Sequence, residues 1–184
     1  MPASLGKYYD QVALGRVFIG SNAVGGTAFP ISTGTAVTVG LWNASQSKNA
    51  VLLGLNIGFT SGTIALGEIG IANQNVGYNI ATGAAMTAFN DSPSSIKNAL
   101  LGGGDQTAMN FSAAATTTLT AGGTACWWSG KSIESATPGL GIFSANIDID
   151  GVVIVAPGQI AFVCGSVAQT GLFTMSLIWA EVDN

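Results

Sequence analysis

Residues 51–59 read VLLGLNIGF, and this stretch decides the fold. Apolar side chains recur at every second position, and the positions between them are mostly glycine or asparagine; the recurring set is Val51, Leu53, Leu55, Ile57 and Phe59. Successive side chains of a strand point to opposite faces, whereas a helix cannot use a period of two. The pattern therefore predicts a β-strand with one face in the core.

This strand is followed by a turn and a second stretch of strand composition. Ser61-Gly62 is typical of a tight turn, and Thr63–Ala72 follows it. Two strand-like runs joined by such a turn favour antiparallel pairing with each other. The sequence therefore predicts a β-hairpin over residues 51–72.

Other short segments rich in strand-forming residues lie along the rest of the chain. They are Val12–Ile19, Ala36–Trp42, Thr116–Ala121, Ala125–Ser129, Ile142–Ile149, Val152–Val155, Gln159–Cys164 and Leu172–Val182. Glycine and proline turn signals such as Gly122-Gly123, Pro138-Gly139 and Pro157-Gly158 separate them. Many short strands with this punctuation are typical of antiparallel sandwiches and barrels. We expect an all-β protein, an antiparallel β-sandwich of jelly-roll type.

One short helix is expected near residues 93–101. Ser92 suits the N-cap position and Pro93 suits the first helical position. Ile96 and Leu100 form an apolar pair four residues apart, and Gly102 stands where a glycine commonly ends a helix.

The length of 184 residues suits one domain with a core of its own. No repeat or linker divides the chain, so we expect a single β-sandwich domain over residues 16–184. Residues 1–15 are expected to form an N-terminal arm outside the sandwich, because termini are often loosely held. No apolar segment follows Lys7, so the arm does not have the pattern of a signal peptide.

Charged residues are scarce, at 8% of the chain against about 25% in a typical soluble domain. A folded monomer of this size exposes about 8,200 Å². Its 5 basic and 9 acidic residues then give about one charge per 590 Å², against about one per 180 Å² for an average composition. So much neutral surface favours contacts between subunits, and we expect a homo-oligomer.

The composition also excludes several classes of function. The chain has no histidine, which excludes His-dependent catalytic triads and His-ligated metal sites. The glycine runs lack the spacing of phosphate-binding loops, and no base is placed to activate a serine or threonine. The formal net charge is −4, and the few cations lie far apart, at Lys7, Arg16, Lys48, Lys97 and Lys131. We therefore expect no enzymatic activity, no cofactor and no nucleic-acid partner.

Residues 151–180 carry no charge and are long enough to span a bilayer as a helix. However, Pro157-Gly158, Gly165-Ser166 and Gln169-Thr170-Gly171 cut this stretch into pieces of strand length. We expect strands here and no membrane partner.

Asp148 and Asp150 lie two residues apart, so on a strand both would point to one face, roughly 6.5–7 Å apart. One interpretation is a weak metal site or a carboxylate pair for acid–base chemistry. The other is a solvated face opposite an inward-pointing Ile147 and Ile149. We favour the second, because no further acid lies nearby in the sequence.

Cys126 and Cys164 both fall inside expected strands. They could bridge the two sheets, or they could be two small buried side chains. We favour reduced and buried thiols.

Adjacent aromatic residues occur twice, at Tyr8-Tyr9 and Trp127-Trp128. Neighbouring residues of a strand face opposite ways, so only one of the two tryptophans can enter the core. The other needs a loop or a partner subunit as cover, or it forms a platform for a sugar ring.

The C-terminal part combines an apolar strand, Pro-Gly, a second strand, and a last strand that ends in Trp-x-Glu. It reads VAPGQIAFV over residues 155–163 and LFTMSLIWAEV over residues 172–182. This pattern resembles the capsid decoration or cement proteins of tailed bacteriophages. The resemblance implies a jelly-roll sandwich that forms a homotrimer and binds the major capsid protein on the outer surface of the virion head, after synthesis in the host cytoplasm.

The resemblance implies no catalytic residues to carry over. It implies that an N-terminal segment or one end of the trimer contacts the capsid. The candidates for capsid or subunit contact are Tyr8, Tyr9, Arg16, Trp127 and Trp128. An alternative function is a trimeric receptor- or carbohydrate-binding head of a phage fibre or spike, which would bind glycans at an exposed tryptophan.

Overall fold

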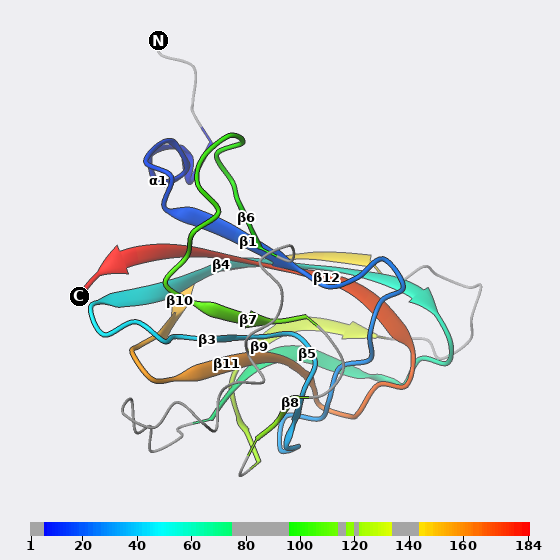
Figure 1. Cartoon of the computed structure of the whole chain (residues 1–184). Coiled ribbons are helices and arrows are strands. Elements are labelled where there is room, and N and C mark those ends of the chain that lie inside the picture. The colour runs from blue at the N-terminus through cyan, green and yellow to red at the C-terminus, as the bar shows by residue number, and fades with distance from the viewer. Residues whose placement is uncertain (1–5, 75–95, 114–116, 120–121, 134–143) are drawn as a thin grey trace.

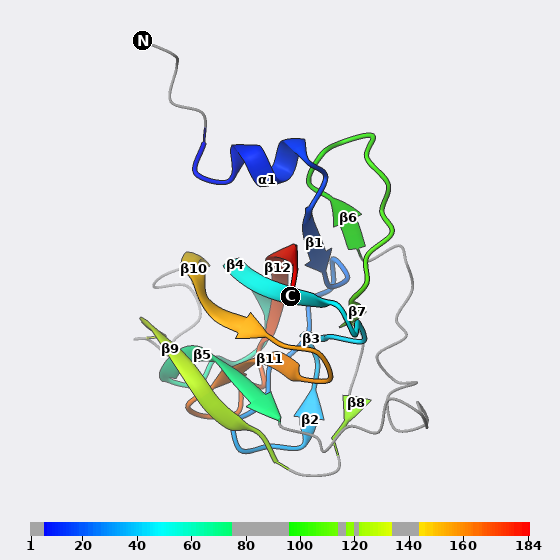
Figure 2. The ribbon, with the colours of Figure 1, turned by 90° about the vertical axis from the view of Figure 1, so that its left-hand side faces the viewer.

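The computed structural model describes residues 6–74, 96–113, 117–119, 122–133 and 144–184. In this part of the chain two five-stranded antiparallel sheets pack face to face as a β-sandwich (Figure 1). A short helix lies on the outer face of one sheet, and a two-stranded ribbon lies on the outer side of the other (Figure 2). The all-β sandwich expected from the sequence is confirmed.

Each sheet combines strands from distant parts of the chain. Sheet A has the order β10 (Ser144–Val155), β4 (Lys48–Ser61), β12 (Leu172–Asp183), β1 (Val17–Ser21) and β6 (Ile96–Asn98). Sheet B has the order β7 (Asn110–Ser112), β3 (Gly40–Trp42), β11 (Ile160–Gly165), β5 (Gly67–Gln74) and β9 (Thr124–Ile133). The ribbon pairs β2 (Ala36–Val37) with β8 (Thr117–Thr118), and the helix is α1 (Tyr9–Ala13).

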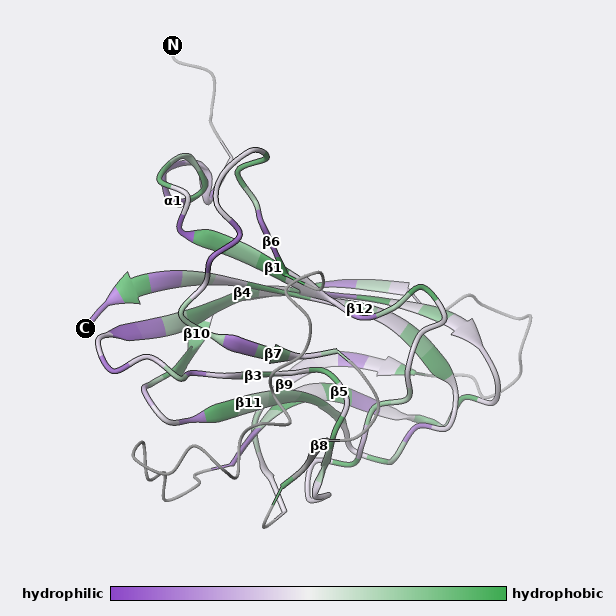
Figure 3. Cartoon of the chain, viewed as in Figure 1, coloured by the Kyte–Doolittle hydropathy of each residue, from purple (hydrophilic) through white to green (hydrophobic). Residues whose placement is uncertain are grey.

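The inter-sheet core contains a stack of aromatic rings. The Trp179 ring lies 6.1 Å from the Phe18 ring of its own sheet and 6.0 Å from the Phe111 ring of sheet B, centroid to centroid. All three side chains are buried. Figure 3 shows hydrophobic residues, in green, along much of the strands of both sheets. These rings hold the edge strand β7 of sheet B against β1 and β12 of sheet A.

The central strand β11 is buried on both faces. Its Ala161 and Val163 belong to the inter-sheet core. The side chains between them belong to a second apolar cluster, which we call the outer cluster of sheet B; its members are Val37, Trp42, Ala72, Leu119, Ile160, Phe162 and Cys164. Val37 comes from the ribbon, so the ribbon covers this outer face.

The decisive strand β4 contains a β-bulge that the sequence pattern does not reveal. Relative to β12 the register shifts, so that Gly54 pairs with Ile178 and Leu52 pairs with Trp179, and Leu53 is left over. The extra residue breaks the alternation, so side chains on the two sides of the bulge no longer follow one regular period of two. Leu55 and Ile57 point into the core as expected, but Val51 and Leu53 lie on the outer face of sheet A. The expectation of one uniform apolar face was wrong at these two positions.

The predicted hairpin over residues 51–72 was also wrong. β4 belongs to sheet A and β5 to sheet B, so the connection between them crosses from one sheet to the other. Ser61 pairs with Leu172 at the end of β4, and Ile64 then turns its side chain into the inter-sheet core. A short turn can join two sheets as readily as two neighbouring strands, and the burial of Ile64 favours the crossing.

The expected helix near residues 93–101 is contradicted in the described residues 96–101. Ile96–Asn98 forms β6, which pairs with β1, and residues 99–101 lie in the loop that follows. Ile96 is buried in the inter-sheet core. Pairing with β1 and burial of this side chain outweigh the local helix signals. Ser92 and residues 93–95 lie outside the described residues.

The remaining expectations hold in part. Val12–Ile19 was expected as a strand, but residues 9–13 are helical and β1 begins only at Val17. The two strands expected over 142–149 and 152–155 are one bulged strand, β10, in the described residues from Ser144 onward. Of the expected strand over residues 116–121, β8 covers Thr117–Thr118, and residues 116, 120 and 121 lie outside the described residues. β6 and β7 are strands that the sequence pattern does not indicate.

Candidate interaction surfaces

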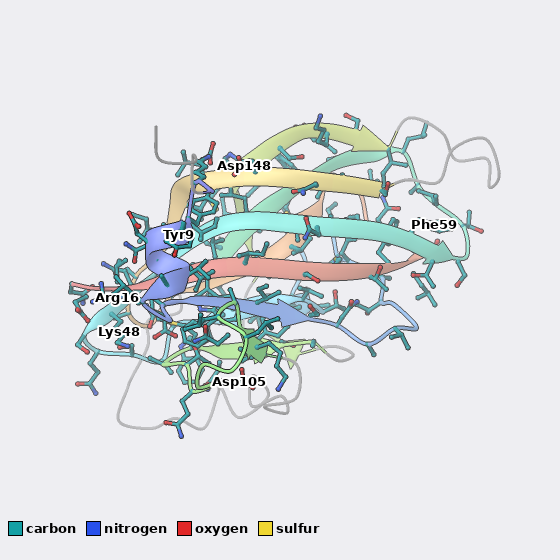
Figure 4. The ribbon with its side chains drawn as sticks, turned by 90° about the horizontal axis from the view of Figure 1, so that it is seen from above. Tyr9, Arg16, Lys48, Phe59, Asp105 and Asp148 are labelled. Atoms are coloured by element: carbon teal, nitrogen blue, oxygen red, sulfur yellow. The ribbon has the colours of Figure 1, made fainter. Side chains whose placement is uncertain are left out.

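The N-terminal arm crosses the outer face of sheet A. Tyr8 and Val12 of the arm pack on an apolar patch, which we call the arm seat; it consists of Val17, Val51, Leu53, Ala99, Ile178 and Ala180. Figure 4 shows the helix running from the Arg16 side of the sheet towards Asp148 on β10. Because the bulge in β4 turns Val51 and Leu53 outward, the arm covers apolar surface that the core does not use.

The base of the arm is held by backbone groups. Gly15 has a φ of 69°, a conformation that suits glycine and lets the chain turn from α1 into β1. The Asn98 side-chain amide donates to the Gly15 carbonyl at 2.8 Å. The backbone N–H of Glu181 donates to the Arg16 carbonyl at 2.9 Å. The arm is thus anchored at β1, β6 and β12.

The tip of the arm is held by polar contacts to the acidic pair on β10. The Lys7 Nζ lies 3.2 Å from Asp148 Oδ2 and also forms an ion pair with Asp150. The Tyr8 hydroxyl lies 2.9 Å from Asp150 Oδ1 and 3.2 Å from Asp148 Oδ1. We call these four side chains the arm latch. All its contacts are at the surface, where single ion pairs contribute little free energy.

The arm latch changes the interpretation of Asp148 and Asp150. Ile147 and Ile149 are buried and the two aspartates are exposed, but both aspartates pair with the arm. Asp150 has a φ of 55°, however, and Gly151 a φ of 75°, so the strand bulges here and is not regular. The described residues contain no cluster of three or more Cys, Asp or Glu side chains that could hold a metal ion.

The pKa of Lys7 reflects this environment. Desolvation by neighbouring atoms lowers the pKa, but the hydrogen bonds to Asp148 and Tyr8 and the negative charge of Asp148 raise it by more. The net result is a raised pKa, so Lys7 stays charged over the whole physiological range.

The β6–β7 loop and α1 both stand out above sheet A (Figures 1 and 2). Leu101 is 92% exposed and Leu14 is 62% exposed, and Tyr9 and Leu100 are also exposed. We call these four residues the apolar protrusion. Such an exposed group of large apolar side chains is typical of a contact surface.

The loop that carries Leu100 and Leu101 is fixed at its base. Asp105 accepts from the Asn98 backbone N–H at 2.8 Å and from Lys97 Nζ at 2.7 Å. The hydrogen bond from Lys97, followed by that from the Asn98 N–H, lowers the pKa of Asp105. The leucines are therefore presented on an ordered loop.

Glu181, the acid of the Trp-x-Glu pattern, holds the far end of the same loop. Its carboxylate is buried and accepts from Lys48 Nζ at 3.2 Å, from the Ala108 backbone N–H at 2.9 Å, and from the Thr107 hydroxyl. Burying a carboxylate is costly unless it is hydrogen-bonded and paired, and these three partners satisfy it. Glu181 thus fixes the end of this loop, a structural role that the sequence pattern does not indicate.

Trp127 and Trp128 face opposite ways, as the alternation predicted. Trp127 packs against the inter-sheet core, whereas Trp128 is 38% exposed on the outer face of sheet B. Gly70 pairs with Trp128 on one side and with Cys164 on the other. A Cβ at Gly70 would lie 2.6 Å from the Trp128 ring, so the missing side chain makes room for the indole.

Both cysteines are free thiols. Cys164 is buried in the outer cluster of sheet B, and burial raises its pKa to about 12. Cys126 is exposed, so the expectation that both thiols are buried was wrong for this residue. A bulge in the β5–β9 pairing turns it out of the sheet, beside a hollow of about 220 Å³ between β10 and sheet B. Burial of part of the side chain still raises the pKa of Cys126.

The structure divides the five predicted contact residues into two groups. Tyr8, Tyr9 and Arg16 lie on or beside the arm, with Tyr8 in the latch and the other two exposed. Trp127 and Trp128 lie on β9 of the other sheet. Sequence reasoning missed Leu101, although a leucine pair directly before three glycines is a signal of apolar side chains on an exposed loop.

Comparison with known proteins gives no matching family model, no matching curated protein and no matching solved structure. In the described part of the chain, no helix has both the length and the apolar character that crossing a membrane requires.

Proposed function

We propose that this chain is a virion structural protein: a homotrimeric decoration or cement protein of jelly-roll type that binds the major capsid protein on the outer surface of the head. It is made in the host cytoplasm and stabilises the head without catalysing a reaction. The proposal rests on the residues that resemble such proteins, on the β-sandwich and on the shortage of charge.

The observation that carries the proposal is the apolar protrusion. Four large apolar side chains stand out from one face of a chain with only 8% charged residues. Exposed large apolar side chains suit burial against another protein surface. The net charge of −4 suits a position away from packaged DNA.

Stabilisation would follow from mass action. A trimer that binds the assembled shell more tightly than its separated capsomers shifts the equilibrium towards the assembled form. Closed symmetry would also bury edge strands such as β10 and β9, which otherwise invite pairing with other chains.

The test is occupancy on capsids that lack the protein. Full-length chain is added to purified heads, unbound chain is removed, and the bound amount is measured by quantitative mass spectrometry. Leu101→Asp is expected to lower the apparent affinity at least about tenfold, because burying an unpaired carboxylate costs more than about 1.4 kcal/mol.

Val24→Asp is the matched control, because Val24 is 94% exposed but lies outside the apolar protrusion. It should leave occupancy unchanged. Equal loss in both variants would remove the protrusion as the contact surface. Failure of the unchanged chain to bind any head would reject the function.

The alternative is a receptor- or carbohydrate-binding head, and the exposure of Trp128 favours it. An indole with one face free can stack on a sugar ring. Binding on a glycan array that is lost in Trp128→Ala would support this function over capsid decoration.

A further inference from the structure

We propose that the arm seat of one copy accepts the arm of a second copy, so that the arm is an exchangeable clasp between subunits. The inference rests on the homo-oligomer of the proposed function and deepens it by naming the surface and the segment that meet. The partner is a second copy of this chain.

The seat is an apolar surface that requires a cover. Val17, Leu53 and Ala180 are 2%, 5% and 4% exposed, although all three lie on the outer face of sheet A. Strand pairing continues this row outward, from Val17 to Ala180, then to Val51, and then to Ile154 on the edge strand β10. Ile154 is exposed, so the arm covers only part of the row.

The arm is complementary to the seat in charge as well as in apolar contact. Lys7 of the arm lies between two carboxylates of β10, and Tyr8 adds its hydroxyl to the same pair. These contacts define what the seat binds: a short segment with a cation and an aromatic residue at one end and an aliphatic residue one helical turn further on. The arm of every copy carries this pattern.

The arm can also leave its seat without disturbing the inter-sheet core, which contains no arm residue. No residue of α1 is buried, and Tyr8 at its N-terminus makes no capping hydrogen bond. The latch lies on β10, an edge strand at the perimeter of the molecule. Exchange between identical copies re-forms the same contacts, which is why it is an inexpensive route to oligomers.

The length of the arm allows exchange. Within one copy the arm spans from β1 to β10, three strand spacings and hence about 14 Å. With α1 kept helical, residues 6–15 reach about 24 Å once the turn is opened. Opening the turn at Gly15 therefore lets the tip reach the sheet of a copy placed beside β6 or β10.

The experiment is a charge-swap complementation in the full-length chain. The arm variant is Lys7→Glu. The seat variant is Asp148→Lys with Asp150→Asn, because asparagine tolerates the positive φ of position 150. Neither variant can close its own latch. In an equimolar mixture, each arm meets an oppositely charged seat only on a copy of the other variant.

Native mass spectrometry with one variant labelled with ¹⁵N measures the composition of the assemblies. Arm exchange predicts that the ratio of mixed to unmixed assemblies exceeds the statistical ratio about two- to fivefold, the range expected for exposed ion pairs. It also predicts that hydrogen-exchange protection of residues 6–15 is weak in each variant alone, returns in the mixture, and falls on dilution.

The chain carrying all three substitutions is the control, since its latch can close within one copy. Full arm protection in this chain at every dilution, together with statistical mixing of the two variants, would overturn the exchange. If the unchanged chain forms oligomers under those conditions, the subunit association of the proposed function stands and only the clasp fails. If the unchanged chain stays at a single-chain mass of 18.4 kDa at all concentrations, the clasp is overturned, and capsid occupancy still tests the proposed function separately.

Discussion

The two sheets of the sandwich cover their outer faces in different ways. On sheet B the ribbon covers the outer cluster, in which Phe162 and Cys164 are fully buried. On sheet A the arm covers a smaller seat with a helix that has no buried residue, and exposed charges hold its tip. The comparison indicates that the first cover is part of the folded core, whereas the second can detach while the sandwich stays folded.

The largest expected difference is in the effect of cavity-forming substitutions under the two covers. Phe162→Ala should lower the free energy of unfolding by about 3–5 kcal/mol, because the rigid strands around it cannot fill the space. Leu53→Ala should cost about 2 kcal/mol, at the low end for leucine, because the arm can settle into the gap. Urea unfolding measures both; equal losses would show that the arm is as rigid as the ribbon.

Thiol labelling distinguishes the exposed cysteine from the covered one. At pH 8 Cys126 should react with an alkylating reagent, whereas Cys164 should react far more slowly, because burial raises its pKa to about 12 and leaves little thiolate. The rate for Cys164 should rise with pH, since alkali increases the thiolate fraction. Peptide mass spectrometry follows the two sites, and comparable rates in the native state would mean that the ribbon opens readily.

Gly70 packs closely against β9, so the stability of the protein should be sensitive to one added methyl group at this position. In Gly70→Ala the Cβ would meet the Trp127 carbonyl at 2.4 Å, so the backbone must move. We expect a loss of about 1–3 kcal/mol and a red shift in tryptophan fluorescence.

Gly58→Ala is the matched control on sheet A, where the nearest atom would be the rotatable Thr174 hydroxyl at 3.1 Å. It should change stability by less than about 0.5 kcal/mol. A larger loss of stability in Gly58→Ala than in Gly70→Ala would contradict the expectation that an added methyl group is tolerated better on sheet A than on sheet B at these positions.

A smaller effect is expected from the arm itself. Val12→Ala removes one of the two arm side chains on the seat and should cost about 0.5–1.5 kcal/mol. The loss should appear as faster hydrogen exchange in residues 6–15, with the exchange of β4 and β12 unchanged. Equal acceleration across both strands would show that the arm unfolds together with the sandwich.

The smallest expected effect is the pH dependence of hydrogen exchange in the loop beside the base of the arm. Hydrogen bonds from Lys97 and the Asn98 N–H lower the pKa of Asp105. A lowered folded-state pKa gives stability that is present above the ordinary value and is lost as the pH falls through the folded value. Below about pH 4 the amide of Asn98 should therefore exchange faster, relative to its intrinsic rate, and Asp105→Asn should abolish this dependence.

The strand pattern made the sandwich predictable, because alternation with a period of two is a local property. The run QIAFVC at residues 159–164 was likewise expected as a strand, and β11 covers Ile160–Gly165. The split of Trp127 and Trp128 between two faces followed from the same rule. The errors occurred where one extra residue or one distant partner decided the outcome, as with the bulge at Leu53 and the pairing of Ile96 with Gly20.

The sequence shows which residues could take part in the candidate site, but not which of them meet. The sequence contains Lys7, Tyr8 and the acidic pair, but their meeting depends on contacts between residues about 140 positions apart. Leu101 was visible as an apolar residue beside glycines, yet its exposure depends on Asp105 and Glu181 holding the loop ends.

By itself, the sequence determined the all-β class, the shortage of charge and many of the strand positions, because composition and alternation act on neighbouring residues. Only the tertiary structure decided that β4 and β5 belong to different sheets, that Val51 and Leu53 face outward, and that the arm lies across them. Those outcomes depend on burial against residues far away in the chain, and the free energy of burial is fixed only when the whole sandwich has formed.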